Sequence, residues 1–109
     1  MLEHEIQNDI IENLLRAGIY CFRNNSGAFS SQYENKKGEV KTRFIQFGLP
    51  GSSDIIAIYK GLFVGIEVKR KGGKQSDEQK AFQRNVEDSG GIYILAFSWD
   101  DVNKKIQTL

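Results

Sequence analysis

The chain has 109 residues, of which 39% are hydrophobic and 11% aromatic, so we expect a single globular domain over residues 1–109. A formal net charge of +1 does not by itself indicate a nucleic-acid-binding protein, and any such binding would have to come from local basic clusters. One cysteine excludes an internal disulfide, and one cysteine with one histidine argues against a zinc site of the usual ligands. No apolar run reaches the length of a membrane-spanning helix and no leader-like segment opens the chain, so we expect a cytoplasmic protein with no membrane partner.

Residues 2–17 have the spacing of an amphipathic helix, which Gly18 would end. On a helical wheel Glu3 and Gln7 fall inside the apolar stripe, whereas Glu5 faces solvent. A carboxylate that points toward a core needs a partner, so Glu3 is a candidate site residue and Gln7 a candidate supporting residue. The alternative is that Glu3 lies in a frayed first turn, where an acidic side chain favours the helix dipole.

Residues 19–23 predict a short strand, and Arg23 at its end is either a phosphate contact or a solvated side chain of the following turn. Residues 28–47 predict a hairpin with few core residues and with its tip at residues 34–38. This hairpin is suited to contact a phosphate backbone, although charged runs are often only solvated surface. Its basic side chains are Lys36, Lys37, Lys41 and Arg43.

The rest of the chain is organised around residues 53–70, which read as a β-hairpin with Lys60–Gly61 as a two-residue turn. In that register Asp54 lies directly opposite Glu67, and like charges at such positions are destabilising. Lys69 would lie on the same strand face as Glu67. The simplest explanation is a divalent cation held by the two carboxylates, with the lysine beside it. The alternative is an exposed sheet face with ordinary charges, on which the lysine neutralises the pair.

A flexible basic segment follows, and its side chains Arg70, Lys71 and Lys74 are candidate DNA contacts. Residues 76–79 then have the pattern of a capping box that opens a helix to about residue 89. Gln79 is therefore either a helix cap or a residue that orients a catalytic group.

Residues 92–98 are almost entirely apolar, which predicts a central strand buried on both faces. Ser98 and Asp101 repeat the capping pattern and predict a short helix to about residue 106. The expected order is α-β-β-β-α-β plus a short C-terminal helix, forming one mixed α/β sheet with helices packed on it.

Several segments in chain order resemble the virus-type replication-repair nuclease (VRR-NUC) domain of the PD-(D/E)XK nuclease superfamily, and they cover nearly all of the chain. One departure is Ser53, because the family usually has proline just before the metal-binding aspartate. The similar segments are Glu3-His-Glu-Ile-Gln7, Arg23-Asn-Asn-Ser-Gly27, Gly48-Leu-Pro-Gly51 followed by Asp54, Glu67-Val-Lys69, Gly73-Lys-Gln-Ser-Asp-Glu-Gln79 and Gly90-Gly-Ile-Tyr93.

The resemblance implies a restriction-endonuclease-like core, in which Asp54, Glu67 and the Val68 carbonyl hold Mg²⁺ or Mn²⁺ and Lys69 acts on the attacking water. It adds Glu3 as a further metal-site residue and Gln79 as a residue near the reaction. The implied activity is a structure-selective DNA endonuclease, acting as a homodimer on branched DNA such as a four-way (Holliday) junction. The alternative is a non-catalytic or RNA-directed nucleic-acid-binding module on the same fold.

Overall fold

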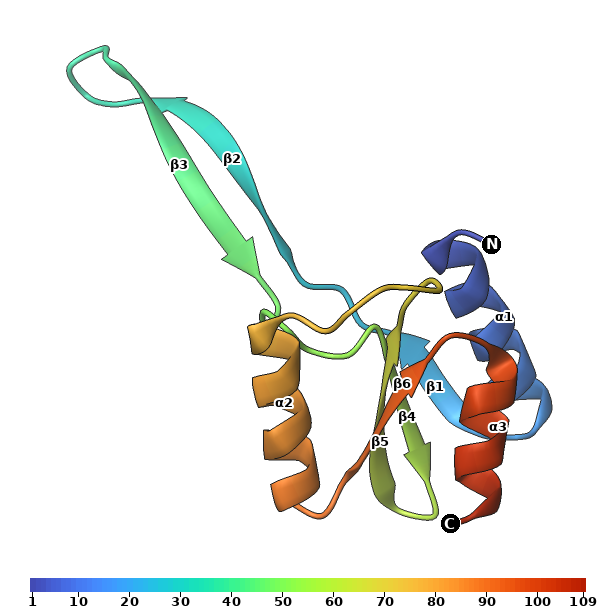
Figure 1. Ribbon diagram of the computed structural model, residues 1–109. Coiled ribbons are helices and arrows are strands. Elements are labelled where there is room, and N and C mark those ends of the chain that lie inside the picture. The colour runs from blue at the N-terminus through green and yellow to red at the C-terminus, as the bar shows by residue number, and fades with distance from the viewer.

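The computed structural model describes residues 1–109, which form a mixed α/β structure with one four-stranded mixed sheet, one two-stranded sheet and three helices (Figure 1). In chain order the elements are α1 (Glu3–Arg16), β1 (Tyr20–Arg23), β2 (Gly27–Glu34), β3 (Val40–Phe47), β4 (Ile55–Tyr59), β5 (Leu62–Val68), α2 (Asp77–Asp88), β6 (Ile92–Ala96) and α3 (Trp99–Gln107).

The four-stranded sheet has the order β1-β4-β5-β6, with β1, β4 and β5 antiparallel and β6 parallel to β5. Lys60 and Gly61 form the turn between β4 and β5 with φ angles of 49° and 80°. Positive φ at both positions is the geometry of a tight hairpin turn with the natural strand twist. The predicted register is confirmed, since Ile55 pairs with Ile66.

Helices cover both faces of this sheet (Figure 1). On one face α1 and α3 bury Ile10, Leu14 and Val102 against Ile55 and Ile66. On the other face α2 packs on the β6 side, where the rings of Phe82 and Tyr93 meet edge to face with centroids 6.3 Å apart. The β1 side of that second face has no helix over it.

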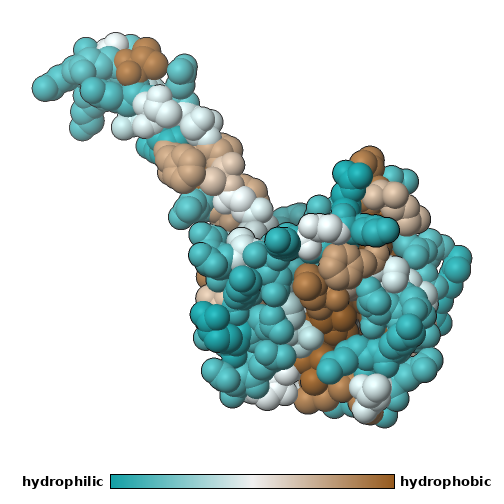
Figure 2. Space-filling view, in the orientation of Figure 1, coloured by the Kyte–Doolittle hydropathy of each residue, from teal (hydrophilic) through white to brown (hydrophobic).

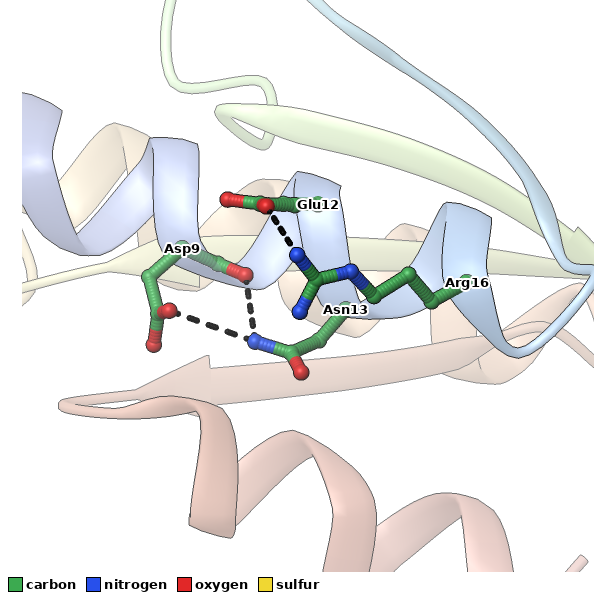
Figure 3. A network of polar contacts seen from close by, with 4 residues as sticks. All are labelled: Asp9, Glu12, Asn13 and Arg16. Carbon is green, nitrogen blue, oxygen red and sulfur yellow. Dashed lines mark hydrogen bonds and ion pairs between the residues drawn. The ribbon is translucent and has the colours of Figure 1, made fainter.

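Polar pairs one turn apart cover the outer surface of α1 (Figure 3). Arg16 pairs with Glu12 at 2.6 Å, and the Asn13 side chain donates to the Asp9 carbonyl at 2.8 Å. Such exposed pairs add only a few tenths of a kcal/mol each, about 0.3 to 0.5. The helix therefore depends mainly on its apolar stripe for its position.

Residues 27–47, which we call the arm, form the separate two-stranded sheet of β2 and β3 and project away from the rest of the chain (Figure 1). The molecule is consequently elongated, with extents of 61 × 31 × 28 Å. Every residue of β2 is exposed. Figure 2 shows apolar and weakly polar residues along the arm with no other part of the chain covering them on this side.

The structure corrects two expectations about the C-terminal third. β6 is an edge strand rather than a central one, and its apolar side chains are buried or half-buried because helices cover both faces. Figure 2 shows a hydrophobic strip between α2 and α3, where β6 runs. The Ser98 side chain makes no capping bond; instead the Phe97 N–H donates to Asp101 Oδ2 at 2.8 Å. No helix in the structure combines the length and apolar character needed to cross a membrane.

Candidate active site

Asp54 and Glu67 meet at the end of the β4–β5 hairpin opposite its turn. Asp54 immediately precedes β4 and is half-buried, whereas Glu67 lies in β5 with only 2% of its surface exposed. The Val68 N–H donates to Asp54 Oδ2 at 2.7 Å and fixes that carboxylate across the hairpin. The strand pairing places both acidic side chains on the face where α2 lies, beside Gly65 and Tyr93.

Glu67 is strongly perturbed by this placement. The pKa of Glu67 is raised from its ordinary 4.5 to about 9, chiefly by burial and also by the hydrogen-bonding contact with the Asp54 carboxyl and the charge of that carboxyl. The Lys69 ammonium lowers the pKa of Glu67, and the Glu3 carboxylate raises it. With no cation bound, this raised pKa favours the retention of one proton by the carboxyl pair near neutral pH.

Lys69 follows β5 and is half-buried, and none of the three ion pairs of the chain involves it. The loop after it folds back over its stem, because a Cβ placed on Gly73 would lie 3.2 Å from Lys69 Cβ. Glu3 is exposed in the first turn of α1, outside the buried part of the helical stripe, which begins at Ile6. Its charge nevertheless acts on Glu67, so it lies near the pair without being buried with it.

The carboxylate oxygens of Asp54 and Glu67 suit a hard divalent cation, but these two side chains alone do not complete its coordination. Glu67 Oε1 is buried with no hydrogen-bond partner, an arrangement that is costly unless a proton or a cation compensates it. Oxygen donors of this kind suit Mg²⁺ and Mn²⁺. However, no three His, Cys, Asp or Glu side chains gather closely enough to hold a metal ion. A cation here would rely on Asp54 and Glu67, with the Val68 carbonyl, water and substrate supplying the remaining oxygens.

One predicted site residue, Gln79, has another visible role. The Gln79 Oε1 atom accepts from the Ser76 N–H at 2.9 Å, and the Gln79 N–H donates to Ser76 Oγ at 3.1 Å. This reciprocal capping box accounts for the side-chain oxygen of Gln79, so a catalytic role remains a prediction that would have to use its amide nitrogen. Gln7 is half-buried on α1.

The structure places Tyr93 near the carboxylate pair, with Gln75 hydrogen-bonded to its hydroxyl, which the sequence alone did not indicate. Tyr93 lies beside Gly65 in the adjacent strand, and burial raises its pKa to about 12. The Gln75 side chain donates to the Tyr93 hydroxyl at 3.2 Å and to Gln83 at 2.9 Å. The alternation of β6 placed Tyr93 on one of two faces, but only the parallel register with β5 shows that this face also carries Glu67.

Ser53 and Gly65 fit tightly against each other next to the pair. Ser53 is fully buried, and its Oγ has no hydrogen-bond partner. A Cβ on Gly65 would lie 2.4 Å from that Oγ, so β5 needs glycine at this position. The sequence showed that Ser53 stands where proline was expected, but not what the side chain touches.

The predicted basic contacts fall into three groups. On the body, Arg23 donates to Asn8 of α1, while Arg70 and Lys71 line a pocket of about 290 Å³ together with residues of α1 and the two residues that precede α3. On the arm, Lys41 pairs with Glu39 at 3.1 Å and the Arg43 guanidinium lies 4.7 Å above the Tyr33 ring. The exposed residues Lys36, Lys37 and Lys74 form no ion pair.

None of the three surface pockets is lined by Asp54, Glu67 or Lys69. The carboxylate pair is therefore not part of any of these pockets, and Glu67 itself is almost fully covered. Comparison with protein-family models and with curated proteins gives no match. Inferences about function therefore rest on the residues and geometry of this chain.

Proposed function

We propose that the chain is a metal-dependent endonuclease that hydrolyses phosphodiester bonds of branched DNA, with the four-way junction as the expected substrate. The observation that carries the proposal is the buried, unpartnered Glu67 Oε1 beside Asp54, with Lys69 two residues further on. The resemblance of these residues and their spacing to the PD-(D/E)XK pattern supports the same chemistry.

Each residue of the site has a role in this proposal. Asp54, held by the Val68 N–H, and Glu67, on releasing its proton, would bind Mg²⁺ or Mn²⁺. Such an ion polarises a phosphoryl oxygen and makes water more acidic. The Lys69 ammonium would orient the attacking water and offset negative charge that develops on the phosphate. Glu3 would tune the field at the pair from the first turn of α1.

The surroundings favour a polymer as the substrate. The arm begins beside the site: the Asn24 N–H donates to the Asp54 carbonyl at 2.8 Å. The basic residues Arg70 and Lys71 directly follow Lys69 in the chain. A phosphate backbone lying across the sheet end would meet the positive charge of these two residues beside the reacting bond.

We further propose that two copies act together on a junction. The half of the sheet that α2 leaves uncovered carries Tyr20, Phe22 and Ile58, which are 67%, 45% and 43% exposed. Exposed apolar groups that lie together on one face are typical of an interface. Light scattering with and without junction DNA tests this, and a monomer under both conditions, together with a single nick per junction, would refute it.

The catalytic proposal is tested by cleavage of labelled four-way junction, flap, duplex, single-stranded DNA and structured RNA, with Mg²⁺, Mn²⁺ or EDTA. Asp54→Asn and Glu67→Gln are expected to lower cleavage by at least about 100-fold, since each removes one cation ligand. Glu12→Gln, on the outer face of α1, is the control and should cleave like the unsubstituted chain. Activity within a few-fold of normal in either site variant would reject the site, whereas cleavage of RNA alone would favour the RNA-directed alternative.

A further inference from the structure

The aromatic side chains of the arm do not contribute to the hydrophobic core of the chain. Its two strands pair only with each other, and a lone two-stranded hairpin is at best marginally stable in water. Its large apolar residues stay exposed: Phe29 at 52%, Tyr33 at 42%, Phe44 at 69% and Phe47 at 46%. Side chains of this kind on a projecting element indicate a surface for binding.

The register of β2 with β3 divides the arm into two unlike faces. One face carries Phe29 and Phe47, whose ring centroids are 6.3 Å apart, and Tyr33 with the Arg43 guanidinium 4.7 Å above its ring. We call this the aromatic face of the arm. The opposite face carries Phe44 among serine, glutamine and threonine side chains.

Charge separates the arm from the rest of the chain. Residues 27–47 contain four basic and two acidic side chains, which gives a net charge of +2. The remaining residues contain eleven basic and twelve acidic side chains, which gives −1. The arm is therefore a cationic limb on a nearly neutral body, and two aromatic faces from two copies would bring like charges together. A polyanion with flat apolar groups complements this face better.

We infer that the aromatic face of the arm binds unpaired nucleobases by stacking, and so selects nucleic acid that has single-stranded or splayed segments. The inference rests on the proposed function and adds to it the feature of the substrate that is recognised. Aromatic rings and arginine planes stack on bases without regard to sequence, and a fully paired duplex exposes base faces only at its ends. Phe29 and Phe47 cannot hydrogen-bond to phosphates, which favours bases over backbone as their contact.

The attachment of the arm connects such binding to the candidate site. The Asn24 side chain at its base donates to Ser52 Oγ and to the Ser53 carbonyl, both at 2.9 Å. On the returning strand, Gly48 approaches Asn25 so closely that a Cβ would lie 2.6 Å from the Asn25 carbonyl oxygen. The arm is thus fixed to the loop that carries Asp54, and a base stacked near its root would bring the adjoining backbone toward the site.

A matched pair of variants tests the inference: Phe29→Ala on the aromatic face and Phe44→Ala on the opposite face. Binding is measured by fluorescence anisotropy in EDTA, with single-stranded DNA, a gapped junction and blunt duplex as probes. Phe29→Ala is expected to weaken single-strand and gapped-junction binding about 10-fold or more, because one base stack contributes roughly that much. Phe44→Ala should change binding to any probe less than about 2-fold, and neither variant should change duplex binding.

Two further measurements separate the possible outcomes. Arg43→Lys keeps the charge and removes the planar group, so it should weaken single-strand binding more than duplex binding even if Phe29→Ala disorders the arm. Equal losses for the two phenylalanine variants, or for single strand and duplex, would overturn the inference. A fall in molar mass for Phe29→Ala in light scattering would also overturn it, because the aromatic face would then be a contact between copies. The proposed function has its own test. If Asp54→Asn still cleaves DNA while Phe29→Ala weakens only the binding of unpaired DNA, the proposed function is wrong and the stacking inference holds.

Discussion

Replacing Glu67 by glutamine keeps the size of the side chain and removes its titration. The unsubstituted chain in EDTA must take up a proton on folding, because the pKa of Glu67 rises from 4.5 to about 9. At pH 7.5 this uptake costs up to about 4 kcal/mol, at 1.36 kcal/mol per pH unit above the ordinary pKa. Glutamine avoids that cost, so Glu67→Gln should raise the free energy of unfolding by about 1 to 4 kcal/mol.

The pH dependence has a definite sign. Between pH 4.5 and 9 the folded state holds the proton and the unfolded state does not, so the unsubstituted chain loses stability as pH rises through this window. Below pH 4.5 both states are protonated, and the contribution is fully present. The advantage of Glu67→Gln should therefore be near zero at pH 4.5 and largest near pH 9.

Urea unfolding followed by the fluorescence of Trp99, the single tryptophan, measures this difference at several pH values in EDTA. Glu12→Gln is the control, since an exposed ion pair contributes at most about 1 kcal/mol and its loss should show no such trend. Added Mn²⁺ should stabilise the unsubstituted chain more at pH 8.5 than at pH 6, because the cation competes with the proton, and should have little effect on Glu67→Gln. A difference between Glu67→Gln and the unsubstituted chain that stays constant with pH, or that favours glutamate at high pH, would refute the reasoning.

Gly65→Ala should destabilise the fold by about 1 to 3 kcal/mol, because the added methyl group would collide with Ser53 Oγ. Adding Ser53→Ala removes that oxygen and should restore most of the lost stability. Urea unfolding of the single and double variants measures this rescue, and its absence would show that the contact is unimportant. Ser53→Ala alone should be neutral or slightly stabilising in the same experiment, since its buried Oγ has no partner, and a loss above about 1 kcal/mol would contradict this. Gly51→Ala should prevent stable folding, because φ at this position is +81° and a Cβ would lie 2.6 Å from backbone atoms of the first turn of α2. A circular dichroism spectrum like that of the unsubstituted chain would contradict this reasoning. Glu3→Gln should lower the cleavage rate more than Glu5→Gln, because only the Glu3 charge acts on Glu67, while Glu5 Oε1 accepts from the Leu2 N–H. Equal cleavage rates for the two variants would show that Glu3 does not belong to the site.

Local signals predicted most of the elements. The Lys60–Gly61 turn fixed the hairpin register, because a two-residue loop leaves one way to pair the flanking strands. Gly18 and the Ser76 capping box marked the end of α1 and the start of α2. The arm was predicted from the turn residues at 34–38 and from flanking segments that supply few core side chains.

Features that depend on distant contacts were not predictable in the same way. An apolar strand such as β6 is compatible with a central position or with an edge covered by helices on both faces, and the sequence does not distinguish them. The pairing of Asp54 with Glu67 followed from the register, but the unpartnered Oε1 and the neighbouring Tyr93 required the tertiary packing. The helical wheel placed Glu3 inside the apolar stripe of α1, but Glu3 is exposed because the buried part of the stripe begins at Ile6.

The arm is inserted between β1 and β4, two strands that pair directly with each other. Its two ends meet where Gly48 approaches Asn25, so the chain leaves the core and returns to it at nearly one point. A short loop joining these ends would keep the register of β1 with β4 and every residue of the core. The length and composition of the arm can therefore vary independently of the sheet. Exchanging the arm for another would change what the protein binds and would leave the carboxylate pair in place.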